Sequence, residues 1–97
     1  MPAYVVVNVT VTDPDGYQEY VREVQPSIQT YGGRYLVRGG RTEILEGVYV
    51  PLRFVVVEFR DFDTARAWWN SPEYSAAKKI RHANATTDMF IVDGVTS

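Results

Sequence analysis

Short runs of apolar and β-branched residues along the chain predict four β-strands. The first covers residues 4–11, where valine at every odd position forms one face, and Tyr4, Val6, Asn8 and Thr10 form a mixed second face. The others cover residues 34–38, 53–60 and 87–93. The third is apolar on both faces apart from Glu58, which is typical of a strand in the middle of a sheet.

The segment between the second and third strands is less regular. A glycine pair at residues 39–40 closes the second strand, and Gly47 and Pro51 indicate a loop over residues 46–52. Residues 42–45 are interpreted as an extension of the second strand after a bend or bulge.

A first helix is predicted between the first two strands. The Asp13-Pro14 pair supplies a capping residue followed by proline at the first helical position, where its missing N–H costs nothing. Apolar residues then recur three and four positions apart from Tyr17 to Tyr31. Pro26 lies inside this stripe and predicts a kink or a short restart, and Gly32-Gly33 ends the helix.

A second helical region is expected in two pieces after the third strand. Asp63 can cap the first piece, which runs through Trp68 and Trp69. The Ser71-Pro72 pair then begins a second piece that extends to about His82. We expect a small inner face on this second piece, which lets it lie close to a sheet and consists of Ala76, Ala77, Ile80 and Ala83.

These elements follow the order β-α-β-β-α-β, the split βαβ motif of ferredoxin-like α+β folds. Right-handed crossovers place both helices on one face of a four-stranded antiparallel sheet. The other face keeps apolar residues of the first and third strands, and a bare apolar sheet normally marks an interface. We therefore expect a single domain over residues 1–97 that forms a homodimer through the uncovered sheet face.

Composition excludes several classes of protein. The 97 residues include no cysteine and one histidine, so we expect no disulfide framework, thiol nucleophile, metal site or cofactor. Ten basic and twelve acidic residues give a net charge of -2, which does not favour binding to nucleic acid or to an anionic membrane. No segment approaches the roughly twenty apolar residues of a membrane span, and the N-terminus lacks signal-peptide features, so the expected location is the cytoplasm.

RNA-recognition domains share this order of elements and need a separate test. They stack bases on exposed aromatic residues of the central strands and carry basic flanks. The third predicted strand has alternating aliphatic residues and Glu58 instead. Nucleic acid is therefore not an expected partner.

Three polar residues interrupt the predicted strands. Asn8 lies among valines, Glu58 ends the apolar run of the third strand, and Arg38 closes the second. Buried charged groups need partners, so convergence of these three would form either a structural network or a site for a carboxylate or carbonyl group. An alternative is that they form a structural ion pair or simply mark strand ends at the solvent.

Aromatic residues are the second set of candidates. They can line a pocket between helices and sheet, or they can serve only as core, because an aromatic stripe at helical spacing is ordinary amphipathicity. His82 is a conceivable general base, but its spacing from Tyr74 and Lys78 places it on the outer side of its helix, so we expect a solvated surface residue. The aromatic candidates are Tyr17, Tyr20, Tyr31, Tyr35, Trp68 and Tyr74.

Several runs of residues resemble one family over essentially the whole chain. They are Asp13-Pro14 with Tyr17 and Tyr20, the run of residues 31–40, residues 45–47 and 57–59, and residues 65–68 followed by Ser-Pro-Glu-Tyr at 71–74. In this order they resemble the DUF1330 family. The resemblance implies a small bacterial protein with a ferredoxin-like, dimeric α/β-barrel fold and no established biochemical activity. The segment at residues 84–88 departs from the family pattern in being less basic, and His82 matches no family position.

Two hypotheses for function follow. In the first, a cleft between helices and sheet binds or acts on a small organic acid or aromatic metabolite, by fold-level analogy with dimeric α/β barrels. Arg38 would hold the anion, Glu58 and Asn8 would orient it, and aromatic residues such as Tyr20 would form the walls. In the second, the protein is a non-catalytic dimerisation module whose aromatic residues are only core. Catalytic residues are not assigned in either hypothesis.

Overall fold

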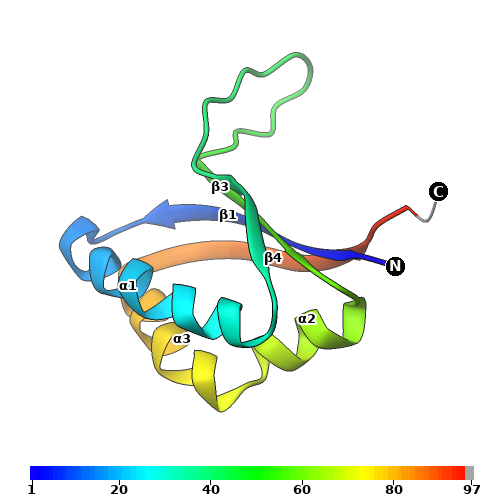
Figure 1. The fold of residues 1–97 in the computed structure, drawn as a ribbon. Coiled ribbons are helices and arrows are strands. Elements are labelled where there is room, and N and C mark those ends of the chain that lie inside the picture. Colours follow the sequence, from blue (N-terminus) through cyan, green and yellow to red (C-terminus); the bar gives the residue numbers. More distant parts are fainter. Residues whose placement is uncertain (96–97) are drawn as a thin grey trace.

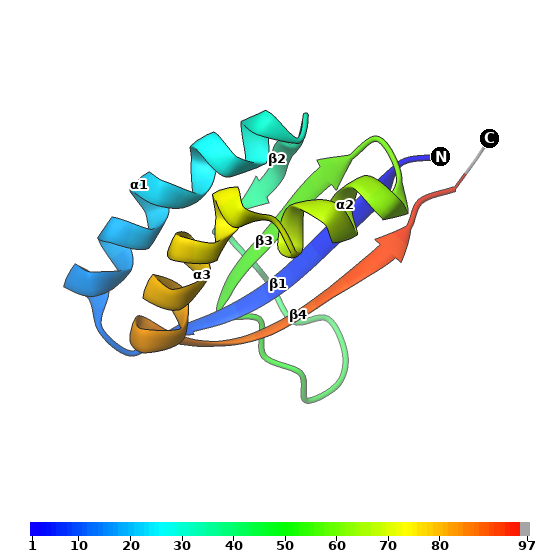
Figure 2. The ribbon, with the colours of Figure 1, turned by 90° about the horizontal axis from the view of Figure 1, so that it is seen from below.

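Four antiparallel strands form one sheet whose order is β2-β3-β1-β4. The computed structural model describes residues 1–95. The strands are β1 (Ala3–Val11), β2 (Arg34–Arg38), β3 (Arg53–Phe59) and β4 (Ala85–Asp93). The helices are α1 (Pro14–Thr30), α2 (Phe62–Trp69) and α3 (Pro72–Asn84), and all three lie on one side of the sheet (Figures 1 and 2). The fold is ferredoxin-like α+β, as the order of elements predicts.

The two-residue alternation of β1 decides which face meets the helices. Ala3, Val5, Val7 and Val9 are buried, and the residues between them are only partly covered. Val5 lies opposite Val57 of β3 and Ile91 of β4, so the helix-facing side of all three strands is aliphatic. β1 and β3 are the two central strands, and the apolar character of β3 predicts its place in the middle of the sheet.

Side-chain caps begin the helices. Asp13 accepts a hydrogen bond from the Gly16 amide at 3.3 Å, and Ser71 accepts one from the Tyr74 amide at 3.1 Å, as predicted. The prediction that Asp63 caps α2 is wrong. Asp61 accepts from the Thr64 amide at 2.7 Å, because the helix already begins at Phe62.

α1 runs without interruption through Pro26, so the predicted restart is also wrong. Pro26 is exposed, and the carbonyl of Arg22 that it leaves without an N–H partner is on the side of the helix that water reaches. α1 ends at Thr30, two residues before Gly32, whose φ of 71° is the left-handed conformation that favours glycine, so the glycine pair ends the helix as predicted.

α3 is rotated relative to the predicted inner face. Ala77 is buried and Ile80 is half-buried, but Ala76 and Ala83 are exposed. The buried stripe instead contains Tyr74, Ala77 and Arg81. The ring of Tyr74 packs 4.1 Å from that of Trp68, and burying this large side chain turns the helix away from the alanine pattern.

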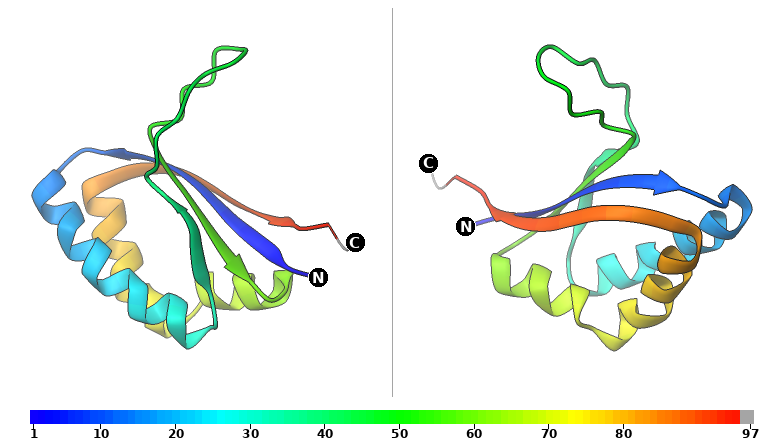
Figure 3. Two further views of the ribbon diagram at one scale, coloured as in Figure 1. Left: turned by 45° about the horizontal axis from the view of Figure 1, so that its top comes forward. Right: turned by 180° about the vertical axis from the view of Figure 1, so that it is seen from behind.

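Residues 39–52 form a long projecting loop, which we call the arm, that stands away from the sheet (Figures 1 and 3). No strand extends over residues 42–45, so that interpretation is wrong. At its base, the Gly39 amide donates to the Phe54 carbonyl at 2.8 Å, and the φ of 68° at Gly39 directs the chain out of the sheet. The arm exposes apolar side chains of Ile44, Leu45, Val48, Tyr49, Val50 and Leu52.

The core fills the space between the sheet and the helices, where Val5, Phe59, Trp68 and Tyr74 are fully buried. In the part of the chain that the structure describes, no helix covers the opposite side of the sheet, which we call the open face (Figure 3). It carries Tyr4, Val6, Phe54, Val56, Phe90 and Val92. Within residues 1–95, no helix has the length and apolar character needed to cross a membrane.

Candidate functional site

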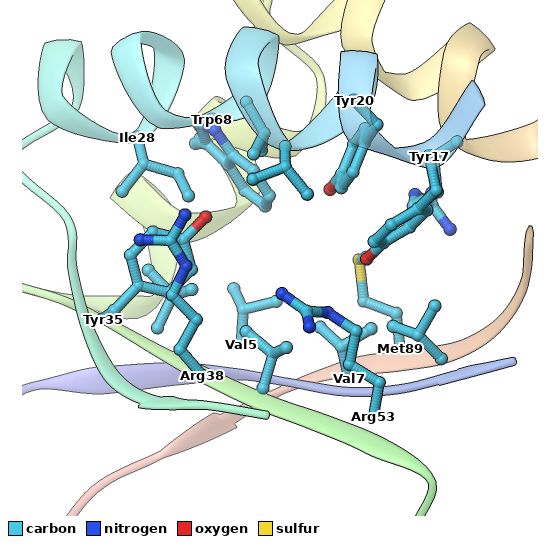
Figure 4. Close-up of a pocket in the computed structure, with 16 residues that line it drawn as sticks. Val5, Val7, Tyr17, Tyr20, Ile28, Tyr35, Arg38, Arg53, Trp68 and Met89 are labelled. Carbon is cyan, nitrogen blue, oxygen red and sulfur yellow. The ribbon is translucent and has the colours of Figure 1, made fainter. Parts of the chain in front are cut away.

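A recess lies between α1 and the helix-facing side of the sheet (Figure 4). Aliphatic side chains of β1 and β3 form its floor, and α1 forms its roof. The free volume between the side chains is about 30 Å³, which admits only water-sized groups. A small-molecule ligand would therefore enter only if the side chains at the mouth moved outward.

Arg53 reaches into this recess from the first position of β3. It alternates with Val55 and Val57, so the same two-residue periodicity that buries those valines directs the arginine toward the helices. Its guanidinium carbon lies 5.6 Å from the centre of the Tyr17 ring, and Figure 4 shows the group directed toward the middle of the recess. Its Nε atom is buried and has no hydrogen-bond partner. A buried donor without an acceptor is costly, which is the state that a bound anion would relieve.

Arg38 lies at the mouth of the recess, at the last position of β2 and opposite Val55 of β3. Its guanidinium carbon stacks 4.5 Å from the centre of the Tyr35 ring. The stacking holds a cation beside an apolar wall while the side chain stays exposed. Arg38 and Arg53 therefore flank the entrance, one from each end of the arm.

Arg81 supplies a third guanidinium from α3 and is only 3% exposed. Its Nε donates to the Tyr74 hydroxyl at 3.2 Å, and its Nη1 donates to the Thr87 hydroxyl. Its Nη2 lies 3.3 Å from Nε2 of His82. None of these partners is a carboxylate, and the ion pairs found within residues 1–95 involve none of Arg38, Arg53 and Arg81. The recess is thus surrounded by three positive charges that no carboxylate neutralises.

Tyrosines provide the remaining polar groups. Burial raises the pKa of Tyr17 and Tyr35, and burial together with the neighbouring Tyr74 raises the pKa of Tyr20 well above its ordinary value. All three are therefore neutral phenols at physiological pH. Phenols and guanidinium groups can donate hydrogen bonds, and neither carboxylate nor imidazole lines the described recess. The arrangement can bind and stabilise a negatively charged or electron-rich oxygen.

The structure brings together only part of the predicted site. Tyr20, Arg38 and Trp68 line the recess, and Tyr74 lies directly behind Tyr20. Tyr31 lies outside it and donates from its hydroxyl to the Glu73 carboxylate at 3.2 Å. His82 is exposed, as expected.

The hypothesised convergence of Asn8, Arg38 and Glu58 is wrong, because the sheet lies between them. Asn8 and Glu58 occupy even positions of β1 and β3 and face the open side, whereas Arg38 faces the helices. Glu58 pairs with Arg34 at 2.7 Å. Asn8 holds the end of the arm, accepting from the Leu52 amide at 2.8 Å and donating to the Val50 carbonyl at 3.3 Å.

Arg53 and Arg81 are the site residues that the sequence interpretation missed. The spacing of each residue indicated a buried position. Arg53 is in phase with the buried positions of its strand, and Arg81 is seven residues after Tyr74, which is the spacing of two helical turns. Residues 1–95 contain no group of three or more acidic or histidine side chains that could hold a metal ion.

Fold and sheet order define a ferredoxin-like α+β protein with a cationic, phenol-lined recess. The family model for DUF1330, a domain of unknown function, matches residues 2–95, and the chain belongs to this family. No curated protein has a significantly similar sequence.

Solved structures with the same fold have low sequence identity to the chain. A protein of unknown function from Rhodopseudomonas palustris has 18% identity and a TM-score of 0.78, over 99% of this chain and 84% of that one. SnoaB, a cofactor-independent oxygenase from Streptomyces nogalater, has 14% identity and a TM-score of 0.66, over 99% and 95%. A dimeric protein of unknown function with a ferredoxin-like fold from Bacteroides fragilis has 12% identity and a TM-score of 0.58, over 96% of each chain.

Proposed function

We propose that the recess binds a small organic acid with an apolar or aromatic body. The observation that carries this proposal is the set of three guanidinium groups around an apolar recess, none paired with a carboxylate in the described residues. Buried or partly buried cations normally have an anionic partner, and arginine matches a carboxylate with two parallel hydrogen bonds. The aliphatic floor and the tyrosine and Trp68 rings fit the rest of such a ligand.

Arg53 and Arg38 are assigned the anion, because they flank the mouth through which the ligand enters. Arg53 has a donor atom with no partner, and Arg38 is free to move on its exposed stem. Asn8 and Glu58 have no part in this assignment, since they face the other side of the sheet.

The proposed activity is binding rather than a reaction. The polar groups that line the described recess are guanidinium groups and phenols, and the raised pKa values of Tyr17, Tyr20 and Tyr35 keep these phenols protonated, so none is available as a base at physiological pH. SnoaB has the same fold and is described as an oxygenase, but at 14% identity this likeness concerns the fold alone. Cations that hold a bound acid would also stabilise negative charge that develops on an oxygen atom during a reaction.

The test is calorimetric titration of the protein with a panel of alkyl and aryl carboxylates. We expect Arg53→Gln and Arg38→Gln each to weaken binding about 10- to 100-fold, because each removes a charge-assisted hydrogen bond of about 1.5–3 kcal/mol. Arg34→Gln is the matched control, since Arg34 is paired with Glu58 on the open face, and it should leave affinity unchanged. Failure of every carboxylate to bind, or equal binding by Arg53→Gln, would contradict the proposal.

We also propose that the open face joins two copies of the chain in a homodimer. The supporting observation is the set of apolar side chains on this face, among which Phe90 is 57% exposed and Val92 43% exposed. Contiguous apolar patches of this kind normally mark interfaces, and a two-fold axis lets the same surface cover itself. In this respect the chain is also a dimerisation module, whether or not the recess is occupied.

Static light scattering at micromolar concentration tests the dimer. The expected mass is twice the 11.0 kDa of one chain. Phe90→Asp should give a folded monomer, because it would bury an unpaired carboxylate in the apolar interface. Lys79→Asp, on the exposed side of α3, should remain dimeric, and a monomeric native protein would refute the proposal.

A further inference from the structure

One guanidinium group and the hydroxyl groups of two tyrosines form a chain of hydrogen bonds that ends in the recess. Arg81 donates from Nε to the Tyr74 hydroxyl at 3.2 Å, and the Tyr74 and Tyr20 hydroxyls lie 3.0 Å apart. Arg81, Tyr74 and Tyr20 are 3%, 0% and 8% exposed, so water has little access to the chain. Figure 4 shows the Tyr20 hydroxyl directed from α1 into the recess.

Hydrogen-bond satisfaction fixes the direction of this chain. Arginine can only donate, so the Tyr74 oxygen accepts from Arg81. If Tyr20 donated to Tyr74 as well, the Tyr74 proton would have no acceptor at a fully buried position, which is unfavourable. The alternative has Tyr74 donating to Tyr20, which gives the fully buried Tyr74 proton an acceptor. The Tyr20 oxygen then accepts from Tyr74, and the Tyr20 proton is left for an acceptor in the recess.

We infer that Tyr20 donates a hydrogen bond to a second oxygen of the ligand, and that Tyr74 and Arg81 are positioning residues for this donor. This inference rests on the proposed function, in which Arg38 and Arg53 hold the carboxylate. It narrows the ligand class to organic acids with a carbonyl oxygen on the apolar body, which is to say keto acids. Donation along the chain from a fixed cation polarises each hydroxyl and strengthens the last donor.

Matched ligand pairs separate the second oxygen from the carboxylate. Levulinate and pentanoate differ by one ketone oxygen, as do benzoylpropanoate and phenylbutanoate. Each pair is titrated calorimetrically into the native protein and into Tyr20→Phe, Tyr74→Phe and Tyr31→Phe. Tyr31→Phe is the control, because it removes a phenol that lies outside the recess and donates to Glu73. Circular dichroism and thermal melting verify that each variant is folded.

In the native protein we expect the keto acid of a pair to bind about three- to tenfold more tightly than its partner, the effect of one net hydrogen bond. Tyr20→Phe should abolish this preference and leave the Kd of the simple acid within about twofold of native. Tyr74→Phe should reduce the preference, and Tyr31→Phe should retain it. No preference in the native protein, or a preference that survives Tyr20→Phe, overturns the inference while the proposed function stands. If no member of either pair binds, the proposed function fails together with it.

Discussion

Trp68 connects the recess to the helical core at the residue scale. Its indole N–H donates to the Ser27 hydroxyl at 3.0 Å, and that hydroxyl in turn donates to the Val24 carbonyl at 2.6 Å. Its ring centre lies 4.1 Å from that of Tyr74 and 5.5 Å from that of Phe59. One side chain therefore fixes both a polar contact to α1 and the aromatic packing behind Tyr20.

Replacing Trp68 by phenylalanine should lower the free energy of unfolding by about 1–3 kcal/mol, because it changes the core shape and leaves the buried Ser27 hydroxyl without its donor. Urea denaturation followed by circular dichroism measures the difference. Trp69→Phe is the matched control, since Trp69 is 38% exposed, and it should cost about 0.5 kcal/mol or less. Equal effects for the two substitutions would show that Trp68 does not carry the role assigned to it.

The site was readable from sequence only in part. Helical spacing identified aromatic residues such as Tyr20 and Trp68 as candidates, and Arg38 was identified by its place at a strand end. Arg53 and Arg81 were missed although their spacing matches buried positions, because hydrophobic patterns assign charged residues to the solvent. Asn8 and Glu58 were assigned to the site although they face the open side of the sheet. A polar residue within an apolar strand does not indicate by itself which face of the sheet it occupies.

At the element scale, the strands and the caps of α1 and α3 were predictable. The full extent of the arm was not, because only residues 46–52 were predicted as a loop. The odd positions of β1 and the caps of α1 and α3 follow from local rules of periodicity and hydrogen bonding. The arm has no periodicity, and its conformation depends on contacts with residues more than forty positions away, such as those of Asn8. The rotation of α3 likewise depends on Tyr74 meeting Trp68 of another helix.

Asn8 should control the end of the arm. Substitution by alanine removes the acceptor of the Leu52 amide and the donor to the Val50 carbonyl, and each hydrogen bond contributes about 1 kcal/mol. We expect hydrogen exchange of the Leu52 amide to accelerate about tenfold or less, since local opening sets the exchange rate. NMR detects the change.

Thr10→Ala is the control for this measurement, because Thr10 is exposed in the same strand. It should leave exchange at Leu52 unchanged. Unchanged exchange at Leu52 in Asn8→Ala would mean that the two hydrogen bonds do not hold the arm.

At the scale of the whole molecule, the sheet separates two surfaces with different chemistry. The helix-facing side holds the cationic recess, and the open face presents apolar residues for the proposed second copy. The arm connects the two strand ends that carry the recess arginines, since it begins directly after Arg38 and ends directly before Arg53. This division follows from the two-residue alternation of the strands together with right-handed crossovers, which is why the layers were predictable although the ligand site was not.

Proton–nitrogen NMR of the arginine Nε–H groups tests the anion site most directly, with Arg53→Gln used to assign the Arg53 resonance. Titration with phenylbutanoate should shift the Arg53 Nε–H resonance downfield and saturably, because a donor without a partner gains a carboxylate. The Arg34 resonance, already paired with Glu58, should not move. An Arg53 resonance that stays unchanged throughout the titration would contradict the proposal that Arg53 binds the carboxylate of the ligand.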